Sequence, residues 1–216
     1  MPAISCTNEV EHGAMKSTEM EFWDSRYRAG RMPWDMGGIP AALAAYLQKA
    51  SPQRVLIPGC GSGYEVRAFH QCGWDVLAAD YSPAAIARAR KMLGALASRV
   101  VLADFFSHDF GGQPFDVIYE RTFLCSLPPE VWPQYVRRMA GLLADDGKLV
   151  GVFLYGHEDE PPPYPLPQGQ SQALFGQYFT LVEDEPVNDS LPLFAGHERW
   201  QVWQQNLAPQ TVKSPC

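Results

Sequence analysis

The sequence predicts an α/β fold in which a mixed seven-stranded sheet carries helices on both faces and has an antiparallel strand at its edge. Between residues 54 and 154, short apolar runs typical of strands alternate with longer segments whose apolar residues recur at helical spacing. Such alternation is typical of a parallel sheet covered by helices. After residue 176, two strand-like segments follow each other without a helix between them, which suits the edge of a mixed sheet. A chain of 216 residues is long enough to form one domain around one core.

The N-terminal part is predicted to become helical only after an irregular start. Residues 1–15 show no periodicity and are expected to be disordered. From Ser17, apolar and aromatic residues recur at helical spacing, and Thr18 with Glu21 predicts a capping box at the start of this helix. The proline and glycines of residues 32–38 exclude a helix there, so a loop is expected.

Turn and capping residues divide the rest of the chain. Gly73 ends one helix, and Ser82 with Pro83 begins another, because a hydroxyl at the N-cap and proline at the first helical position favour helix initiation. Residues 145–147 predict a turn, and the proline-rich residues 161–167 predict an extended loop. The predicted helices are 17–30, 40–50, 64–71, 82–96, 129–143 and 170–176, and the predicted strands are 54–57, 74–79, 99–102, 115–119, 148–154, 178–184 and 198–205.

The turn after the first predicted strand is the most informative stretch. Three glycines stand there at every second position, Gly59, Gly61 and Gly63. Glycine tolerates positive φ and lets a ligand approach the backbone closely, so this turn is predicted to form the floor of a nucleotide-type pocket. The second predicted strand ends in Asp80, and in a parallel sheet that position can accept hydrogen bonds from a ribose diol. The alternative is an ordinary strand-turn-helix corner.

The glycine spacing favours one class of nucleotide. Dinucleotide-binding turns follow Gly-x-Gly-x-x-Gly, and Tyr64 occupies the place of their last glycine. Gly-x-Gly-x-Gly is the commoner form in enzymes that use S-adenosylmethionine (SAM). A NAD-binding oxidoreductase is further disfavoured because no catalytic Tyr/Lys or His pair is recognisable.

Composition excludes several other functions. The net charge is -7 and the 17 Lys and Arg residues are scattered, which disfavours nucleic acid and favours a small molecule as partner. No apolar run is long enough to span a membrane, and no signal peptide is recognisable, so we expect a cytoplasmic protein, with a monomer favoured. An odd number of cysteines without Cys-x-x-Cys predicts neither a disulfide framework nor a metal site; the cysteines are Cys6, Cys60, Cys72, Cys125 and Cys216.

Three motifs resemble the thiopurine S-methyltransferase superfamily of SAM-dependent enzymes, which includes bacterial thiopurine methyltransferase-like proteins and plant halide and thiol methyltransferases. The resemblance runs from Phe22 to Gln205. Its motifs are Phe22-Trp23-Asp24-x-Arg26-Tyr27 followed by Pro33-Trp34-Asp35-x-Gly37, then Pro58-Gly59-Cys60-Gly61, and then Phe115-Asp116-x-x-Tyr119-Glu120-Arg121. It implies a Rossmann-like methyltransferase domain over residues 16–206, an N-terminal helical lid, and a tail at 207–216.

The resemblance also implies which residues bind SAM, whose product form is S-adenosylhomocysteine (SAH). Aromatic lid residues would close over its methionine part, Asp80 would meet the ribose, and Asp104 and Phe105 would lie near the adenine. The implied cofactor-binding residues are Trp23, Tyr27, Trp34, Gly38, Gly59, Gly61, Asp80, Tyr81, Asp104, Phe105, Glu120 and Arg121. Arg121 agrees with the thiopurine branch and Gly59 with the plant branch, so the subfamily stays open.

The predicted reaction is transfer of a methyl group from SAM to a thiol or another soft nucleophile, such as a thiopurine, a metalloid oxyanion or a halide, on a small molecule. Such a displacement needs alignment and desolvation rather than a base, so no catalytic residue is predicted. Arg121 is predicted to hold the SAM carboxylate or an anionic acceptor, the alternative being a surface arginine paired with Glu120. Tyr155 and Arg199 are candidates for the rim of the acceptor pocket, and residues 157–160 are interpreted as a solvated acidic loop.

Two other functions remain open at this point. One is a small-molecule N- or O-methyltransferase on the same scaffold. The absence of an Asn/Asp-Pro-Pro-aromatic motif after the fourth strand disfavours methylation of bases and amides. The other is a protein that binds SAM without catalysis.

Overall fold

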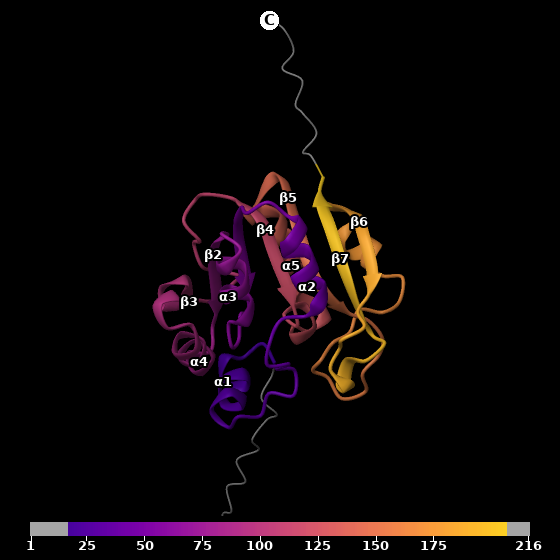
Figure 1. Cartoon of the computed structure of the whole chain (residues 1–216). Coiled ribbons are helices and arrows are strands. Elements are labelled where there is room, and N and C mark those ends of the chain that lie inside the picture. The colour runs from indigo at the N-terminus through magenta and orange to yellow at the C-terminus, as the bar shows by residue number, and fades with distance from the viewer. Residues whose placement is uncertain (1–16, 207–216) are drawn as a thin grey trace, which may run out of the picture.

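The computed structural model describes residues 17–206, and the expectations for residues 1–15 and 207–216 concern parts of the chain outside this range. Seven strands within it form one mixed sheet with helices on both faces (Figure 1), which confirms the predicted fold class. The order across the sheet is β3-β2-β1-β4-β5-β7-β6. The strands are β1 (Arg54–Pro58), β2 (Asp75–Asp80), β3 (Val100–Leu102), β4 (Phe115–Arg121), β5 (Leu143–Leu154), β6 (Phe179–Pro186) and β7 (Glu198–Gln205).

The direction of the strands places a ligand site at one end of the sheet. From β3 to β5 neighbouring strands are parallel, whereas β7 is antiparallel to both β5 and β6. The chain leaves β1 for β2 and β3 on one side and returns to β4 on the other, so strand order reverses between β1 and β4. Ligands of open α/β sheets bind at the carboxyl ends of the strands beside such a reversal. In Figure 1 these ends point toward α1.

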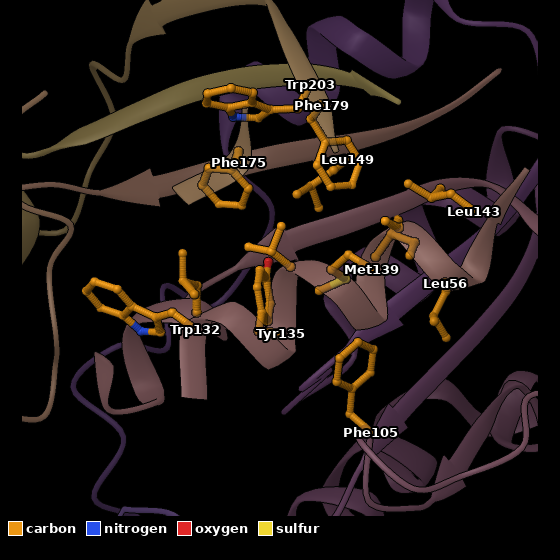
Figure 2. Packing of buried hydrophobic residues seen from close by; sticks show 14 of the residues in the cluster. Leu56, Phe105, Trp132, Tyr135, Met139, Leu143, Leu149, Phe175, Phe179 and Trp203 are labelled. Atoms are coloured by element: carbon orange, nitrogen blue, oxygen red, sulfur yellow. The ribbon is translucent and has the colours of Figure 1, made fainter. Parts of the chain in front are cut away.

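Helices cover both faces of the sheet and bury two apolar layers. α2, α3 and α4 pack on one face, and α5 and α6 on the other. Figure 2 shows the second layer, where Trp132, Tyr135 and Met139 of α5 point toward the sheet. The helices are α1 (Met20–Arg28), α2 (Ala41–Lys49), α3 (Tyr64–Gln71), α4 (Pro83–Leu93), α5 (Trp132–Leu142) and α6 (Ser171–Phe175), with short 3₁₀ helices η1 (Gly94–Arg99), η2 (Leu124–Ser126), η3 (Pro129–Val131) and η4 (Pro192–Phe194). None of the helices in residues 17–206 has the length and apolar character that crossing a membrane requires.

Three local expectations are wrong. The capping box is absent, because α1 begins at Met20 with no side-chain cap, and Glu21 pairs with Arg28 instead. The helix expected at 82–96 ends at Leu93, since Gly94 adopts φ +60° and η1 follows. Residues 145–147 are not a turn before the strand but an irregularity within β5, where the register against β4 shifts. The predicted start at Ser82 is confirmed, because its Oγ accepts a hydrogen bond from the Ala85 N–H at 3.1 Å.

Candidate functional site

A cavity of about 1000 Å³ opens at the carboxyl ends of β1, β2 and β4. Its volume is at the upper end of the range typical for ligand sites, about 300–1,000 Å³, so two small molecules can share it. The N-terminal lid, the glycine turn, the ends of β2 to β4 and two late loops contribute its walls. Of the residues predicted to bind the cofactor, Trp23, Tyr27, Trp34, Gly59, Gly61, Asp80, Tyr81, Asp104, Phe105 and Arg121 line it.

The glycine turn is shaped by its lack of side chains. Gly59 and Gly61 adopt φ +60° and +48°, a region that L-residues rarely occupy. A Cβ on Gly59 would lie 2.5 Å from Cδ2 of Phe123, and one on Gly61 would lie 2.6 Å from the Tyr27 hydroxyl. The turn is therefore a cradle of bare backbone against which the Phe123 and Tyr27 side chains pack closely. This geometry fits the approach of a nucleoside-type ligand.

Asp80 ends β2 beside this turn and is 8% exposed. Its Oδ2 accepts the Gly61 N–H at 3.1 Å, and its Oδ1 accepts the Ser82 N–H at 2.9 Å. Each carboxylate oxygen has two lone pairs, so both keep the capacity to accept one more hydrogen bond. Burial raises the pKa of Asp80 from 3.8 to about 6, although the hydrogen bonds from the backbone oppose the shift. A carboxylate held in this way suits a ribose diol.

The lid aromatics form one cluster above the cavity. Trp34 meets Trp23 edge to face with ring centroids 5.3 Å apart, and it meets Tyr27 in the same way at 6.0 Å. All three rings are half-buried, whereas the neighbouring Phe22 is buried. Trp23 and Trp34 therefore line the cavity and are not part of the core. Burial, and then the nearby Asp80 charge, raise the pKa of the Tyr27 hydroxyl.

Two aspartates that were not among the predicted site residues fasten the lid. Buried Asp24 accepts hydrogen bonds from the Ser82 hydroxyl at 2.8 Å and the Ala84 N–H at 2.7 Å, so it joins α1 to the start of α4. Asp35 accepts the Ser62 hydroxyl at 2.7 Å and thereby joins the lid loop to the glycine turn. Both belong to the N-terminal motifs Phe22-Trp23-Asp24 and Pro33-Trp34-Asp35. These motifs identified the family resemblance, but they did not indicate which residues the two aspartates contact.

A third group of side chains follows β3. Phe105 is buried and packs edge to face on Phe106 and Phe123, at centroid distances of 5.4 and 5.3 Å. Asp104 is exposed, and its carboxylate accepts the Phe106 N–H at 3.0 Å and the Ser107 hydroxyl at 2.8 Å. A carboxylate beside an apolar ring can accept from an exocyclic amine while the ring contacts the base, which fits an adenine.

The end of β4 brings a cation into the cavity. Arg121 lies 3.4 Å from Glu65, and their side chains are 11% and 9% exposed. The alternative pairing of Arg121 with Glu120 is therefore wrong. Burial raises the pKa of Glu65, and the Arg121 charge opposes this. Among the contacts of residues 17–206, Glu65 is the one acceptor of the Arg121 guanidinium, and the buried Tyr119 hydroxyl next to it has no partner. Several donors of Arg121 thus remain for a ligand.

Four predicted residues lie elsewhere. Gly38 and Glu120 do not line the cavity, and Glu120 faces α5 because successive side chains of a strand point to opposite faces. The Tyr155 hydroxyl contacts Gln201, and Arg199 pairs with an aspartate of β6, so neither forms the rim of the cavity. The late rim residues that the sequence analysis missed are Glu158, Glu160, Pro162, Pro163, Leu193 and Phe194. They come from the loop after β5 and from the short 3₁₀ helix η4, and no periodicity in the sequence indicates them.

Two other kinds of chemistry have little support at this site. In the part of the chain that the structure describes, no three His, Cys, Asp or Glu side chains are grouped closely enough to hold a metal ion. Cys60 and Cys125 line the cavity and are buried, and burial raises the pKa of both thiols. Protonated thiols are poor nucleophiles, so neither cysteine is suited to covalent catalysis.

The fold and the site together define a class I SAM-dependent methyltransferase. The sheet order, the glycine cradle after β1 and the acid at the end of β2 all occur where that class needs them. The family model for thiopurine S-methyltransferase (TPMT) matches residues 18–206. The chain therefore belongs to the thiopurine S-methyltransferase family, as the sequence motifs predicted.

Individual relatives agree with this assignment. A probable thiol methyltransferase 2 of Arabidopsis thaliana is 31% identical over 169 residues, which cover 75% of this chain and 74% of the relative. Thiocyanate methyltransferase 1 of the same plant is 28% identical over 211 residues, covering 94% and 92%. The crystal structure of Burkholderia thailandensis 1,6-didemethyltoxoflavin-N1-methyltransferase with bound S-adenosylhomocysteine superposes with a TM-score of 0.69 at 21% identity, covering 91% of this chain and 93% of that one. At this identity the superposition shows a common fold.

Proposed function

We propose that this protein transfers the methyl group of SAM to a thiol or another soft nucleophile on a small molecule. The observation that carries the proposal is the shared cavity, in which the cradle of Gly59 and Gly61, the Asp80 carboxylate and the lid aromatics surround one space beside Arg121. The names of the relatives support a soft acceptor, since those proteins are described as thiol and thiocyanate methyltransferases.

The residues present fit SAM. Asp80 would accept from the ribose, the backbone of Gly59 and Gly61 would lie against the nucleoside, and Phe105 with Asp104 would meet the adenine. When bound, SAM supplies an electrophilic methyl group on a sulfonium. The chain's contribution is to align the acceptor with this methyl group and to exclude water by closing the lid over it, since alignment of reacting atoms at roughly 3–3.5 Å is the main requirement of such a displacement.

Among the described lining residues, carboxylates are the groups that could accept a proton from the acceptor, and they are weak bases. In the described part of the chain, the cavity walls contain neither histidine nor lysine, and the two lining thiols are held protonated by burial. A thiol ionises at a pKa of about 8.5 in water, whereas an alcohol does not ionise near neutral pH. This favours sulfur over oxygen as the attacking atom. The acceptor would occupy the side of the cavity near Phe123, Leu127 and Val131, which is mainly apolar.

A panel of acceptors tests the proposal. Purified protein with SAM labelled in its methyl group would be offered alkyl and aryl thiols, thiopurines, halides, tellurite, amines and alcohols at equal concentration. We expect labelled thioethers to form fastest. Labelled amines or ethers as the main products would contradict the proposal, and so would tight binding of SAM without transfer to any acceptor.

The aromatic lid predicts that one substitution changes the affinity for SAM more than the affinity for its product SAH. Trp34→Leu keeps an apolar side chain but removes the ring, whose face attracts a cation by about 0.5–2 kcal/mol. We expect the affinity for SAM, which carries a sulfonium, to fall about 2- to 30-fold. The affinity for SAH, which is neutral at sulfur, should fall less. Calorimetry with both ligands measures the ratio, and an equal loss for both would show that Trp34 acts by packing alone.

Arg121 gives a second prediction. Arg121→Lys keeps a positive charge opposite Glu65 but loses the planar fork that binds a carboxylate with two hydrogen bonds. If the guanidinium holds the carboxylate of the cofactor, the dissociation constant of SAH should rise about tenfold, since one charge-assisted hydrogen bond contributes about 1.5–3 kcal/mol. Methylthioadenosine lacks that carboxylate, and its affinity should not change.

The two assignments of Arg121 have different outcomes. If it holds an anionic acceptor instead, SAH should bind Arg121→Lys as it binds the wild type, while KM for a carboxylated aryl thiol should rise and KM for an uncharged aryl thiol should not. Unchanged values for SAH and for both thiols would remove Arg121 from the site.

A further inference from the structure

Glu120 is a buried carboxylate, 1% exposed, that the proposed reaction does not use directly. It lies on the face of β4 away from the cavity. Its Oε1 accepts two successive backbone N–H groups, from Phe123 at 2.9 Å and from Leu124 at 3.0 Å. Its Oε2 accepts the hydroxyl of Tyr135 in α5 at 2.7 Å. One carboxylate therefore joins β4, the loop that follows it, and α5.

The loop that Glu120 holds has an unfavourable backbone. Thr122 adopts φ +56°, and among residues 17–206 it is the one non-glycine residue with a positive φ. This conformation is especially costly for a β-branched side chain. Strained residues of this kind persist where surrounding contacts impose them, and they concentrate at functional sites. The two N–H groups that Glu120 accepts belong to the two residues directly after Thr122, so the carboxylate is placed to impose this turn.

The same loop forms one wall of the cavity. Phe123 covers the glycine cradle, since its ring atom lies 2.5 Å from the position of a Cβ on Gly59. Its ring also packs edge to face on Phe105 at 5.3 Å. The lining residues that this loop and the end of β4 contribute are Arg121, Thr122, Phe123, Cys125, Ser126 and Leu127. A change in the loop would therefore move the acceptor side of the cavity more than the ribose side, which Asp80 and the glycine turn fix by other contacts.

We infer that Glu120 is a positioning residue, which together with Tyr135 holds the loop at 121–127 in the strained conformation that aligns the acceptor with the methyl group. This inference rests on the proposed function. It replaces the predicted role of Glu120 as a direct cofactor contact. An ionised carboxylate is suited to the task because it only accepts hydrogen bonds, and all three groups donate to it. Burial raises the pKa of Glu120 to about 7 although these hydrogen bonds oppose the shift, so the variants are compared at pH 8, where the carboxylate is ionised.

Glu120→Gln tests this with a side chain of the same size. The amide has one acceptor oxygen, so its NH₂ group must face either the two backbone N–H groups, which cannot accept, or the Tyr135 hydroxyl, which must then turn from donor to acceptor. In both cases the hydrogen bonds lose the negative charge that strengthens them. We expect kcat with the best acceptor of the panel to fall about tenfold or more, while the SAH dissociation constant stays within about threefold of the wild type. Hydrogen exchange measured by mass spectrometry should become faster in the peptide that contains residues 121–127.

Tyr135→Phe is the second variant, and it covers the case in which Glu120→Gln fails to fold. It removes one donor and leaves the two backbone contacts, so kcat and loop protection should change in the same direction by a smaller factor. Tyr155→Phe is the matched control. It also removes a hydroxyl from a buried tyrosine, one that contacts Gln201 at 3.0 Å away from the cavity, and it should leave kcat at the wild-type value.

The outcomes distinguish a failure of the positioning role of Glu120 from a failure of the proposed methyl transfer. Unchanged kcat and unchanged exchange at 121–127 in both variants would overturn the positioning role. A loss of SAH affinity as large as the loss in kcat would also overturn it, because it would make Glu120 part of the cofactor site. If the wild type methylates no thiol, the proposed function fails, whereas SAH binding and loop exchange still decide whether Glu120 holds the loop.

Discussion

Gly59→Ala is expected to weaken SAH binding about 100-fold or more and to lower the melting temperature by several degrees. The residue adopts φ +60°, which costs an L-residue roughly 1–2 kcal/mol. The new methyl group would also lie 2.5 Å from the Phe123 ring, so the ring and its loop must move. Phe123 lines the cavity, so its displacement would change the surface against which the nucleoside is proposed to lie. Calorimetry with SAH and thermal unfolding without ligand measure the two effects.

Gly94→Ala is the control that separates the effect of backbone strain on stability from the effect of the glycine turn on SAH binding. Gly94 has the same φ of +60°, but a Cβ there meets nothing within 4 Å. It follows α4 on the surface and does not line the cavity. This variant should lose roughly 1–3 kcal/mol of stability, because φ +60° with ψ −113° is strained for an L-residue, and it should keep the wild-type affinity for SAH. If Gly59→Ala binds SAH as well as Gly94→Ala does, the glycine turn is not the floor of the cofactor site.

The order and type of the elements could be predicted because they depend on local pattern. The apolar runs that became β1 and β2, and the Ser82-Pro83 start of α4, are local features that the tertiary structure retains. The errors occur where tertiary contacts override a local preference. Glu21 pairs with Arg28 instead of capping the helix start. Residues 145–147 form an irregularity inside β5, because Leu143 before them and Lys148 after them both pair with β4. No pattern within a few residues reveals either event.

The part of the site that could be predicted is the part whose position follows from the strand order alone. Residues at the carboxyl ends of β1, β2 and β4 meet at one edge whatever their neighbours are, and so Gly59, Asp80 and Arg121 line the cavity as expected. Glu120 does not, because a shift of one residue along a strand reverses the face. The hydrogen bond between Asp35 and Ser62, and the rim residues from the late part of the chain, depend on which distant segments of the chain meet in space. The local sequence pattern does not contain this information.

Asp80→Asn is expected to weaken SAH binding about 30- to 100-fold at pH 7.5 and to remove its dependence on pH. The carboxylate is proposed to accept from the ribose diol, and hydrogen bonds to a charged group contribute about 1.5–3 kcal/mol. An asparagine amide retains one acceptor oxygen and places donors toward the Gly61 N–H. Asp75→Asn is the control, because Asp75 begins the same strand, pairs with Arg99 and should not affect SAH.

The pH dependence follows from the raised pKa of Asp80, about 6 in the ligand-free protein. Since the ligand needs the ionised form, the affinity of the wild type should be constant above pH 7 and fall as the pH drops through 6, by about tenfold at pH 5. Stability should respond in the opposite direction. The folded pKa exceeds the unfolded value, so burying the charged form costs stability above pH 6, and this cost disappears as the pH falls below that value. An affinity that does not change between pH 5 and 8 in the wild type would mean that the Asp80 carboxylate does not meet the ligand.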